Sequence, residues 1–287
     1  MLHVYLSKYW FKRGILHIKN KGFISLIKHL MLSIIKILDI RHADELPYAY
    51  LFKKKRILNK NFIKKNLLKF DDIKIERYFN YFLNTSKIKP KPIIYGFGVG
   101  SQIKFEEALV RKFDIEVFCY DPTSHKFFEN FIGSEKIKFY PFGIWVKDEK
   151  VKLFHDGGVD VIGGSISNLF QADKNNFEEV QCYTLQTLMN KNNHKHIDIL
   201  KMDIEGIAIE VLENIIENNI YPEQIVTEFE FLEKDDLNKD DLVKFNEYSL
   251  QLESLINKMK SLDYKCYEMP RFTNGPYSTI EVLFVRN

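Results

Sequence analysis

Hydrophobic positions follow two different rhythms along this chain, and the rhythm changes near residue 92. Before it, apolar residues such as Phe23, Ile27 and Leu30 recur at the spacing of an amphipathic helix. After it, short apolar runs alternate with amphipathic stretches. This alternation predicts strands joined by helices, and therefore an α/β, Rossmann-like sheet that is mostly parallel and covered on both faces.

The C-terminal end of the pattern departs from the alternation. Two apolar runs, 264–269 and 279–286, have no helix between them and are separated by the turn residues Asn274-Gly275-Pro276. They predict an antiparallel pair at one edge, because parallel strands need a long crossover. The other predicted strands are 92–94, 115–120, 136–140, 180–183, 197–202 and 225–229; the predicted helices are 103–113, 123–131, 206–217 and 235–262, with a hairpin-like excursion at 146–155 and a helical turn at 185–189.

The first 91 residues are predicted to be helical, poor in strands and separate from the α/β domain at 92–287. The prolines of Lys89-Pro90-Lys91-Pro92 end this region, because a proline disfavours helix in the residue before it. The apolar stretch 23–40 is interrupted by Lys28, His29 and Lys36, so we do not expect it to span a membrane. No signal peptide is evident, and we expect a cytoplasmic protein.

Charge divides the chain at the same place. Residues 1–91 carry 21 basic and 6 acidic residues, a balance of +15, whereas the remaining residues carry 21 and 33, a balance of −12. The basic region is interpreted either as a helical cap or homodimer contact with solvated lysines, or as a docking surface for an anionic membrane or a phosphate-bearing acceptor. No nucleic acid partner is expected, because no aromatic-basic recognition motif accompanies the charge.

The three cysteines lie far apart, at Cys119, Cys182 and Cys266. Their number and spacing suggest neither a disulfide framework nor a zinc site, which favours a reducing compartment. No other metal-ligand spacing is present, and no metal is expected; Mg²⁺ held by Asp203 and Glu228 is the alternative, although nothing in the sequence demands it.

A glycine-rich stretch lies where the first strand of the α/β part meets the first helix. Glycines at such a turn let the backbone pass close to a small ligand, and the following helix N-terminus offers N–H groups and a positive dipole end. We therefore expect a nucleotide or nucleoside cofactor here, although a merely tight turn is the alternative. The residues expected to contact it are Tyr95, Gly96, Gly98, Gly100 and Ser101.

Asp121 ends the next predicted strand, 23 residues after Gly98. In doubly wound folds a carboxylate at about this distance accepts hydrogen bonds from ribose hydroxyls. The residues that follow, Pro122 and Thr123, are expected beside the same ligand. An aspartate that only initiates a turn before proline is the alternative.

Carboxylates follow two further strands. Asp203 and Glu205 come directly after the apolar run 197–202, and Glu228 and Glu230 end the next strand. Ligands of open α/β sheets bind outside the carboxyl ends of the strands, so Asp203, Glu205 and Glu228 are candidate catalytic residues. The alternatives are a helix-dipole acid for Glu205 and a solvated strand end for Glu228.

Among the histidines, His155 is the best candidate base, since its ordinary pKa is near neutrality. His194 and His196 precede a strand and are expected at the wrong end of the sheet. The loop residues Ser165, Ser167 and Asn168 are expected to contribute to substrate binding.

These motifs together resemble the FkbM-type class I S-adenosylmethionine-dependent methyltransferases, over roughly residues 92–286. The resemblance implies S-adenosyl-L-methionine as cofactor, with the glycines and Asp203 near its methionine portion and Asp121 at its ribose. Many members methylate sugar hydroxyls, so the implied acceptor is a nucleotide sugar or a building block of a surface or capsular polysaccharide. The segments that carry the resemblance are 95–100, 118–123 and 198–206, the last similar to an Asp-x-x-Lys-x-Asp-x-Glu-Gly signature.

Two other functions compete with a sugar O-methyltransferase. An NAD-dependent reductase would favour Gly-x-Gly-x-x-Gly, but Ile103 stands at the position of the third glycine. A binding or scaffolding protein on a degenerate methyltransferase fold is favoured by Gly96 and Gln102, which stand where related turns often carry an acid.

Overall fold

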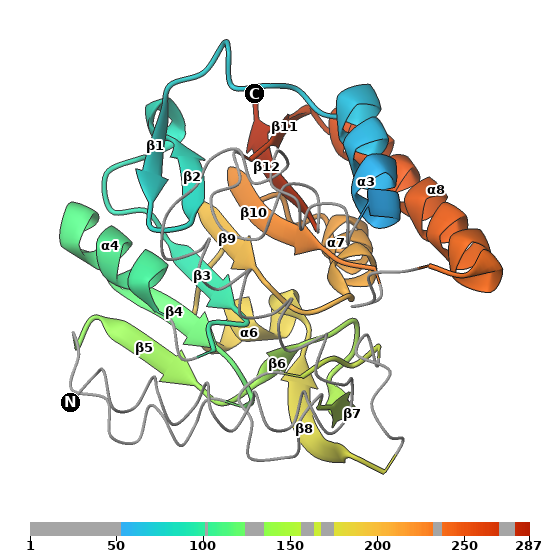
Figure 1. Cartoon of the computed structure of the whole chain (residues 1–287). Helices are drawn as coiled ribbons and strands as arrows, with labels where there is room; N and C mark the ends of the chain where they lie inside the picture. Colours follow the sequence, from blue (N-terminus) through green and yellow to red (C-terminus); the bar gives the residue numbers. More distant parts are fainter. Residues whose placement is uncertain are drawn as a thin grey trace, which may run out of the picture.

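A mixed sheet forms the centre of the molecule (Figure 1). The structure is a computed structural model that describes residues 53–100, 103–123, 135–155, 164–167, 175–231, 237–269 and 279–287. Within these residues the sheet has seven strands in the order β11-β12-β10-β9-β3-β4-β5, and β12 alone runs antiparallel to both of its neighbours. The strands are β3 (Ile94–Phe97), β4 (Val117–Tyr120), β5 (Ile137–Tyr140), β9 (Ile199–Met202), β10 (Gln224–Phe229), β11 (Tyr264–Glu268) and β12 (Ile280–Arg286).

The strand order has a switch point between β3 and β9. From β3 the chain proceeds outward through β4 to β5, and it then returns to place β9 on the other side of β3. Ligands of open α/β sheets bind at the carboxyl ends of the strands beside such a switch. The predicted α/β fold with its antiparallel C-terminal pair is confirmed.

Helices cover both faces of the sheet. One face carries α4 (Lys104–Phe113), and the other carries α6 (Leu185–Lys191), α7 (Ala208–Glu217) and the long α8 (Lys239–Ser261). Helix α3 (Lys53–Asn66) lies beside α8 (Figure 1), where Lys65 Nζ is 2.8 Å from Glu253 Oε1. Helix α3 therefore packs on the long helix α8 near the end of the chain.

Each face of the sheet buries its own apolar cluster, as expected for strands covered on both sides. Tyr95 and Phe97 point toward α6 and α7, whereas Ile94 points toward α4. Gly96 shares this second face, with Cys119 and Lys201 beside it on the neighbouring strands. A glycine and a lysine therefore lie side by side in the middle of a buried sheet.

Local sequence determines the beginning of two helices. Asn238 and Asp241 form a capping box at the start of α8, and Thr184 Oγ1 accepts the N–H of Thr187 at the start of α6. The capping box explains why α8 begins at Lys239, four residues later than the predicted helix 235–262.

A β-hairpin precedes the main sheet in the chain. It lies within residues 1–91, which were expected to be helical and poor in strands. Strands β1 (Ile75–Tyr78) and β2 (Tyr81–Asn84) pair antiparallel, and a short 3₁₀ turn η3 (Thr85–Lys87) follows. The turn places Phe79 at φ 55°, a conformation usually signalled by glycine or asparagine, so the sequence carried little sign of it. The side chain of Gln224 in β10 holds the hairpin by accepting the N–H of Asn84 at 2.8 Å.

A second, smaller sheet holds the excursion after β5. It consists of β6 (Gly143–Ile144), β8 (Phe177–Tyr183) and β7 (Glu149–Phe154), with β8 in the middle. The predicted excursion at 146–155 thus pairs with β8, which is longer than the predicted strand 180–183.

Several expectations lie outside the described residues. They are the basic helix around residues 23–40, most of the predicted helix 123–131, Ser101 and Asn168. None of the helices that the structure describes combines the length and the apolar character that crossing a bilayer requires.

Candidate functional site

The glycine turn lies at the carboxyl end of β3 and touches the end of β9. The predicted turn 95–100 is shorter than expected, because Tyr95, Gly96 and Phe97 belong to the strand. Gly98 and Gly100 have φ values of 65° and 54°, which favour glycine. A Cβ atom on Gly98 would lie 1.7 Å from the carbonyl oxygen of Asp203. Gly98 is therefore required for the close approach of these two strand ends.

The Tyr95 side chain does not belong to this turn. It is fully buried on the α6 face, where its hydroxyl lies 2.9 Å from His194 Nδ1 and accepts the Asn192 Nδ2–H at 2.8 Å. Burial raises the pKa of Tyr95, so the hydroxyl stays protonated. The expectation that Tyr95 contacts a cofactor is corrected to a packing role for its side chain, because strand alternation directs it to the face opposite Gly96.

Asp121 fastens the turn from the neighbouring strand. Its Oδ2 accepts the N–H of Gly100 at 2.8 Å, and its Oδ1 accepts both the N–H and the hydroxyl of Thr123 at 2.8 Å. Asp121 as a whole is only 5% exposed. Because a carboxylate offers about four acceptor positions, these three bonds leave Oδ2 able to accept one more. The ribose role of Asp121 remains a prediction that this geometry permits.

Glu106 of α4 is a buried acid that sequence reasoning missed. A Cβ atom on Gly96 would lie 2.9 Å from Glu106 Oε1, so the carboxyl group fills the space that the glycine leaves open. Within the described residues Oε1 has no hydrogen-bond partner. Burial raises the pKa of Glu106, while the nearby Lys201 opposes the shift. The sequence signal that could have identified Glu106 is its place in the first turn of the helix that follows a glycine-containing strand.

Lys201 joins the glycine turn to the end of its own strand. Its buried ammonium group donates to the carbonyl oxygens of Gly98 at 3.0 Å and Phe97 at 3.3 Å. It also lies 3.7 Å from Asp203 Oδ2 and 5.4 Å from the ring centre of Tyr81. A single buried cation thus holds the turn, a carboxylate and an aromatic ring together.

Besides Lys201, a residue of the hairpin, Tyr81, also contacts Asp203. Tyr81 donates its hydroxyl to Asp203 Oδ2 at 3.0 Å, and the Asp203 N–H donates to the carbonyl oxygen of Phe97 at 3.2 Å. Burial and the negative charges of Asp203 and Glu228 raise the pKa of Tyr81 well above its ordinary value. Tyr81 is therefore a hydrogen-bond donor at any physiological pH and is not a base.

The remaining acids of this edge form two neighbouring pairs, Glu228 with Glu281 and Glu205 with Glu230. Glu228 lies directly opposite Glu281 across β10 and β12. Burial and the neighbouring Glu205 carboxylate raise the pKa of Glu230 well above its ordinary value. Glu205 precedes the N-cap Ile207 and has φ 44°, so it is not a first-turn acid of α7.

No cluster of acids, histidines or cysteines suited to a metal ion occurs among the residues that the structure describes.

The serine loop contacts the same edge, whereas His155 lies in the small sheet. Ser165 donates its hydroxyl to the carbonyl oxygen of Glu205 at 2.6 Å, and Ser165 Oγ is 2.8 Å from Ser167 Oγ. His155 is fully buried at the end of β7, with its Nε2 atom 3.1 Å from Glu178 Oε1. The structure therefore brings Ser165 to Glu205 and gives His155 a carboxylate partner of its own.

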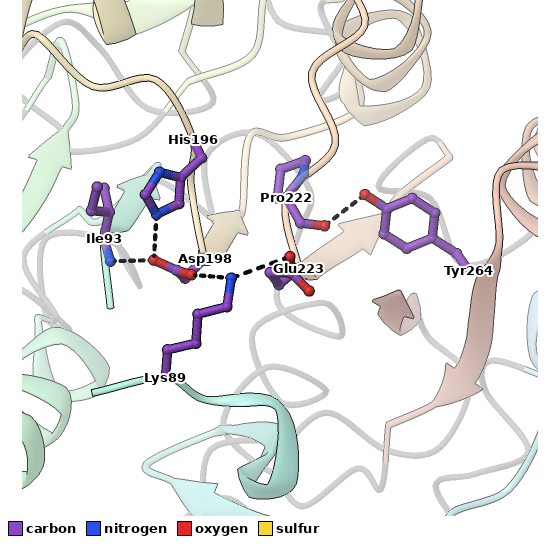
Figure 2. Close-up of polar contacts among 7 residues, drawn as sticks. All are labelled: Lys89, Ile93, His196, Asp198, Pro222, Glu223 and Tyr264. Atoms are coloured by element: carbon purple, nitrogen blue, oxygen red, sulfur yellow. Dashed lines mark hydrogen bonds and ion pairs between the residues drawn. The ribbon is translucent and has the colours of Figure 1, made fainter. Parts of the chain in front are cut away.

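Asp198, the first acid of the signature segment, lies at the opposite end of β9 (Figure 2). Its Oδ2 accepts the N–H of Ile93 at 2.8 Å and is 3.3 Å from His196 Nε2, while Lys89 Nζ is 3.5 Å from its Oδ1. Asp198 thus fastens the start of β9 to the start of β3. The expected position of His196 away from the site is confirmed. Within the segment 198–206, Asp198 has a structural role at the start of β9, whereas Asp203 and Glu205 lie at the other end of the strand, beside the candidate site.

A pH-dependent stability difference is expected for Glu106→Gln. Because burial raises the pKa of Glu106 in the folded chain above its ordinary 4.5, the folded state loses stability as pH rises from this value toward the folded-state pKa. The glutamine variant should therefore have the higher free energy of unfolding at about pH 8 and little advantage at about pH 4. Urea unfolding at both pH values measures this, with Glu107→Gln as the control expected within about 0.5 kcal/mol of the wild type. A glutamine variant less stable at about pH 8 would mean that Glu106 is ionised and paired with Lys201.

The fold and this edge define an α/β protein with a candidate ligand site at the switch point of its sheet. The sequence matches the Methyltransferase FkbM domain over residues 54–266. The chain belongs to the FkbM methyltransferase family.

Solved structures with low identity are also similar. Methyltransferase FkbM from Methylobacillus flagellatus KT has a TM-score of 0.39 and 11% identity, covering 79% of this chain and 50% of its own, so this chain spans about half its length. Human N-acetylserotonin methyltransferase, solved in complex with SAM, has a TM-score of 0.35 and 11% identity, covering 94% of this chain and 69% of its own. A comparison with curated protein sequences found no match.

Proposed function

We propose that this protein is an S-adenosylmethionine-dependent O-methyltransferase that acts on a sugar hydroxyl. The observation that carries the proposal is the convergence of the Gly98 turn, Asp121 and Asp203 at one edge of the sheet, in a chain of the FkbM family. Backbone packed this closely beside two carboxylates suits a ligand with hydroxyl groups and positive charge.

The residues present fit S-adenosylmethionine. The remaining acceptor position on Asp121 Oδ2 suits a ribose hydroxyl. The carboxylate of Asp203, whose side chain is 29% exposed, suits the cationic methionine portion. When bound, the cofactor would supply a methyl group on a sulfonium; an acceptor oxygen would take this methyl group in line, forming the O–C bond as the C–S bond breaks and S-adenosylhomocysteine leaves.

The protein has two tasks in this reaction. The first is to hold the acceptor oxygen in line with the methyl group, and such positioning can supply about 7–11 kcal/mol of the barrier. The second is to accept the proton of a weakly nucleophilic hydroxyl, for which Asp203, Glu205 and Glu228 are the candidates. His155, with Glu178 beside it, is a further candidate.

The sugar acceptor is supported by the serine loop. Ser165 and Ser167 contact each other, and Ser165 contacts the Glu205 carbonyl, so hydroxyl groups lie beside the candidate bases. We propose a nucleotide sugar or a polysaccharide building block as the acceptor. The basic balance of residues 1–91 would suit a phosphate-bearing acceptor or an anionic membrane surface, and a helical cap or homodimer contact is the simpler role.

Calorimetric titration of the full chain tests the cofactor. We expect S-adenosylhomocysteine to bind with a micromolar Kd, on the order of −8 kcal/mol, and NAD to show no heat above dilution. Binding of NAD alone would indicate a reductase, and binding of neither would favour a scaffold. Transfer of labelled methyl from S-adenosylmethionine to a panel of nucleotide sugars then identifies the acceptor.

A further inference from the structure

Tyr81 reaches the site from a part of the chain that lies before the glycine turn. It begins β2 of the hairpin, yet its hydroxyl donates to Asp203 Oδ2 at 3.0 Å across 122 positions of sequence. The hairpin itself is fixed to the sheet by Gln224, which accepts the Asn84 N–H at 2.8 Å and donates to the Asn84 carbonyl oxygen at 3.1 Å. The hairpin, fixed to the sheet in this way, therefore holds the Tyr81 side chain beside Asp203.

The ring of Tyr81 is held as firmly as its hydroxyl. Phe105 of α4 packs edge-on against it with the ring centres 5.0 Å apart. Lys201, in the strand that ends just before Asp203, lies 5.4 Å from the ring centre of Tyr81. Aromatic and cation–π contacts of this kind fix a ring without using its hydroxyl.

Tyr81 and Lys201 approach the same carboxylate oxygen. The hydroxyl and the ammonium group lie 3.0 Å and 3.7 Å from Oδ2 of Asp203. The carboxylate is partly exposed and not enclosed by these contacts, with 29% of its side chain open to solvent. One hydrogen bond and one ion pair to the same oxygen orient the group and leave acceptor positions on its other oxygen for a ligand.

We propose that Tyr81 is a positioning residue, which together with Lys201 holds Asp203 by Oδ2 so that Oδ1 is presented to the ligand. The hairpin is then part of the site. This proposal rests on the proposed function, because it takes Asp203 as the carboxylate that meets the cofactor.

A double-mutant cycle on the full chain tests whether Tyr81 acts through Asp203. S-adenosylhomocysteine affinity is measured by calorimetry for wild type, Tyr81→Phe, Asp203→Ala and the double variant. Tyr81→Phe keeps the ring and should weaken binding about 5- to 30-fold in the wild-type background, but less than about 2-fold where Asp203 is absent. Tyr78→Phe, in β1 of the same hairpin, is the control and should change affinity less than about 2-fold.

A second measurement is independent of any ligand. The ¹³Cζ resonance of Tyr81, assigned with Tyr81→Phe, should move in Asp203→Ala while that of Tyr78 does not. Equal weakening by Tyr81→Phe in both backgrounds, or no weakening at all, would overturn the positioning role. If the wild type binds no S-adenosylhomocysteine, the proposed function fails. The resonance then decides the positioning role, and an unmoved Tyr81 signal overturns that too.

Discussion

Asp203→Asn is expected to abolish methyl transfer while leaving the fold intact. Asparagine has the same shape and still accepts the Tyr81 hydroxyl at the Oδ2 position, so the hairpin contact survives. What disappears is the negative charge that faces Lys201 and, under the proposed function, the proton acceptor or the partner of the cationic cofactor. Loss of a general base alone lowers kcat by about 10²- to 10⁴-fold.

Labelled methyl transfer measures the effect, and circular dichroism with thermal unfolding reports on the fold. The matched control is Asp240→Asn, an exposed first-turn acid of α8 that should retain full activity. Near-normal transfer by a folded Asp203→Asn variant would remove Asp203 from the catalytic residues and leave Glu205 and Glu228 as candidates.

Gly98→Ala is expected to cause the largest loss of stability among single methyl additions at the site. The residue has φ +65°, and the new Cβ would lie 1.7 Å from the Asp203 carbonyl oxygen. Left-handed backbone strain contributes about 1–3 kcal/mol, and the overlap with backbone adds about 1–3 kcal/mol through forced separation of the β3 and β9 ends. We therefore expect a free energy of unfolding lower by about 2–6 kcal/mol, and weakened S-adenosylhomocysteine binding in the fraction that folds.

Gly96→Ala is the control for this substitution. Its new Cβ would meet the tip of the Glu106 side chain at 2.9 Å, which can rotate away, so the loss should be smaller. Urea denaturation of both variants gives the comparison. A Gly98→Ala variant within about 0.5 kcal/mol of wild type would mean that the turn relaxes and that its close approach to β9 is not required.

Much of the site could be predicted because the elements that bear it are local. The apolar run 197–202 followed by two acids placed Asp203 and Glu205 at a strand end, where β9 ends at Met202. The glycine turn and Asp121 were likewise placed correctly at the ends of β3 and β4. Periodicity and turn residues suffice here, since each property depends on a few neighbours in sequence.

The surroundings of Tyr95 and Glu106 were not predicted, because they depend on tertiary packing and not on neighbours in sequence. Tyr95 belongs to the glycine-rich stretch, but one residue of strand alternation turns its side chain into the core beside Asn192. Glu106 looked like an ordinary first-turn acid of α4, and only the packing of α4 over Gly96 makes it a buried acid of the site. Neither outcome follows from a local pattern, because both depend on which element covers which face.

The sequence by itself determined the alternation of strands and helices, the antiparallel pair at the C-terminal edge and the acids at the strand ends. Their physical basis is short-range, in side-chain periodicity and in the backbone freedom of glycine. Only the tertiary structure decided which side chains meet: Tyr81 with Asp203, Glu106 with Gly96, and Lys201 with the carbonyl oxygens of the turn. Two of those contacts join residues more than 100 positions apart, and all three exist because the hairpin and α4 pack on the face of the sheet that carries Lys201.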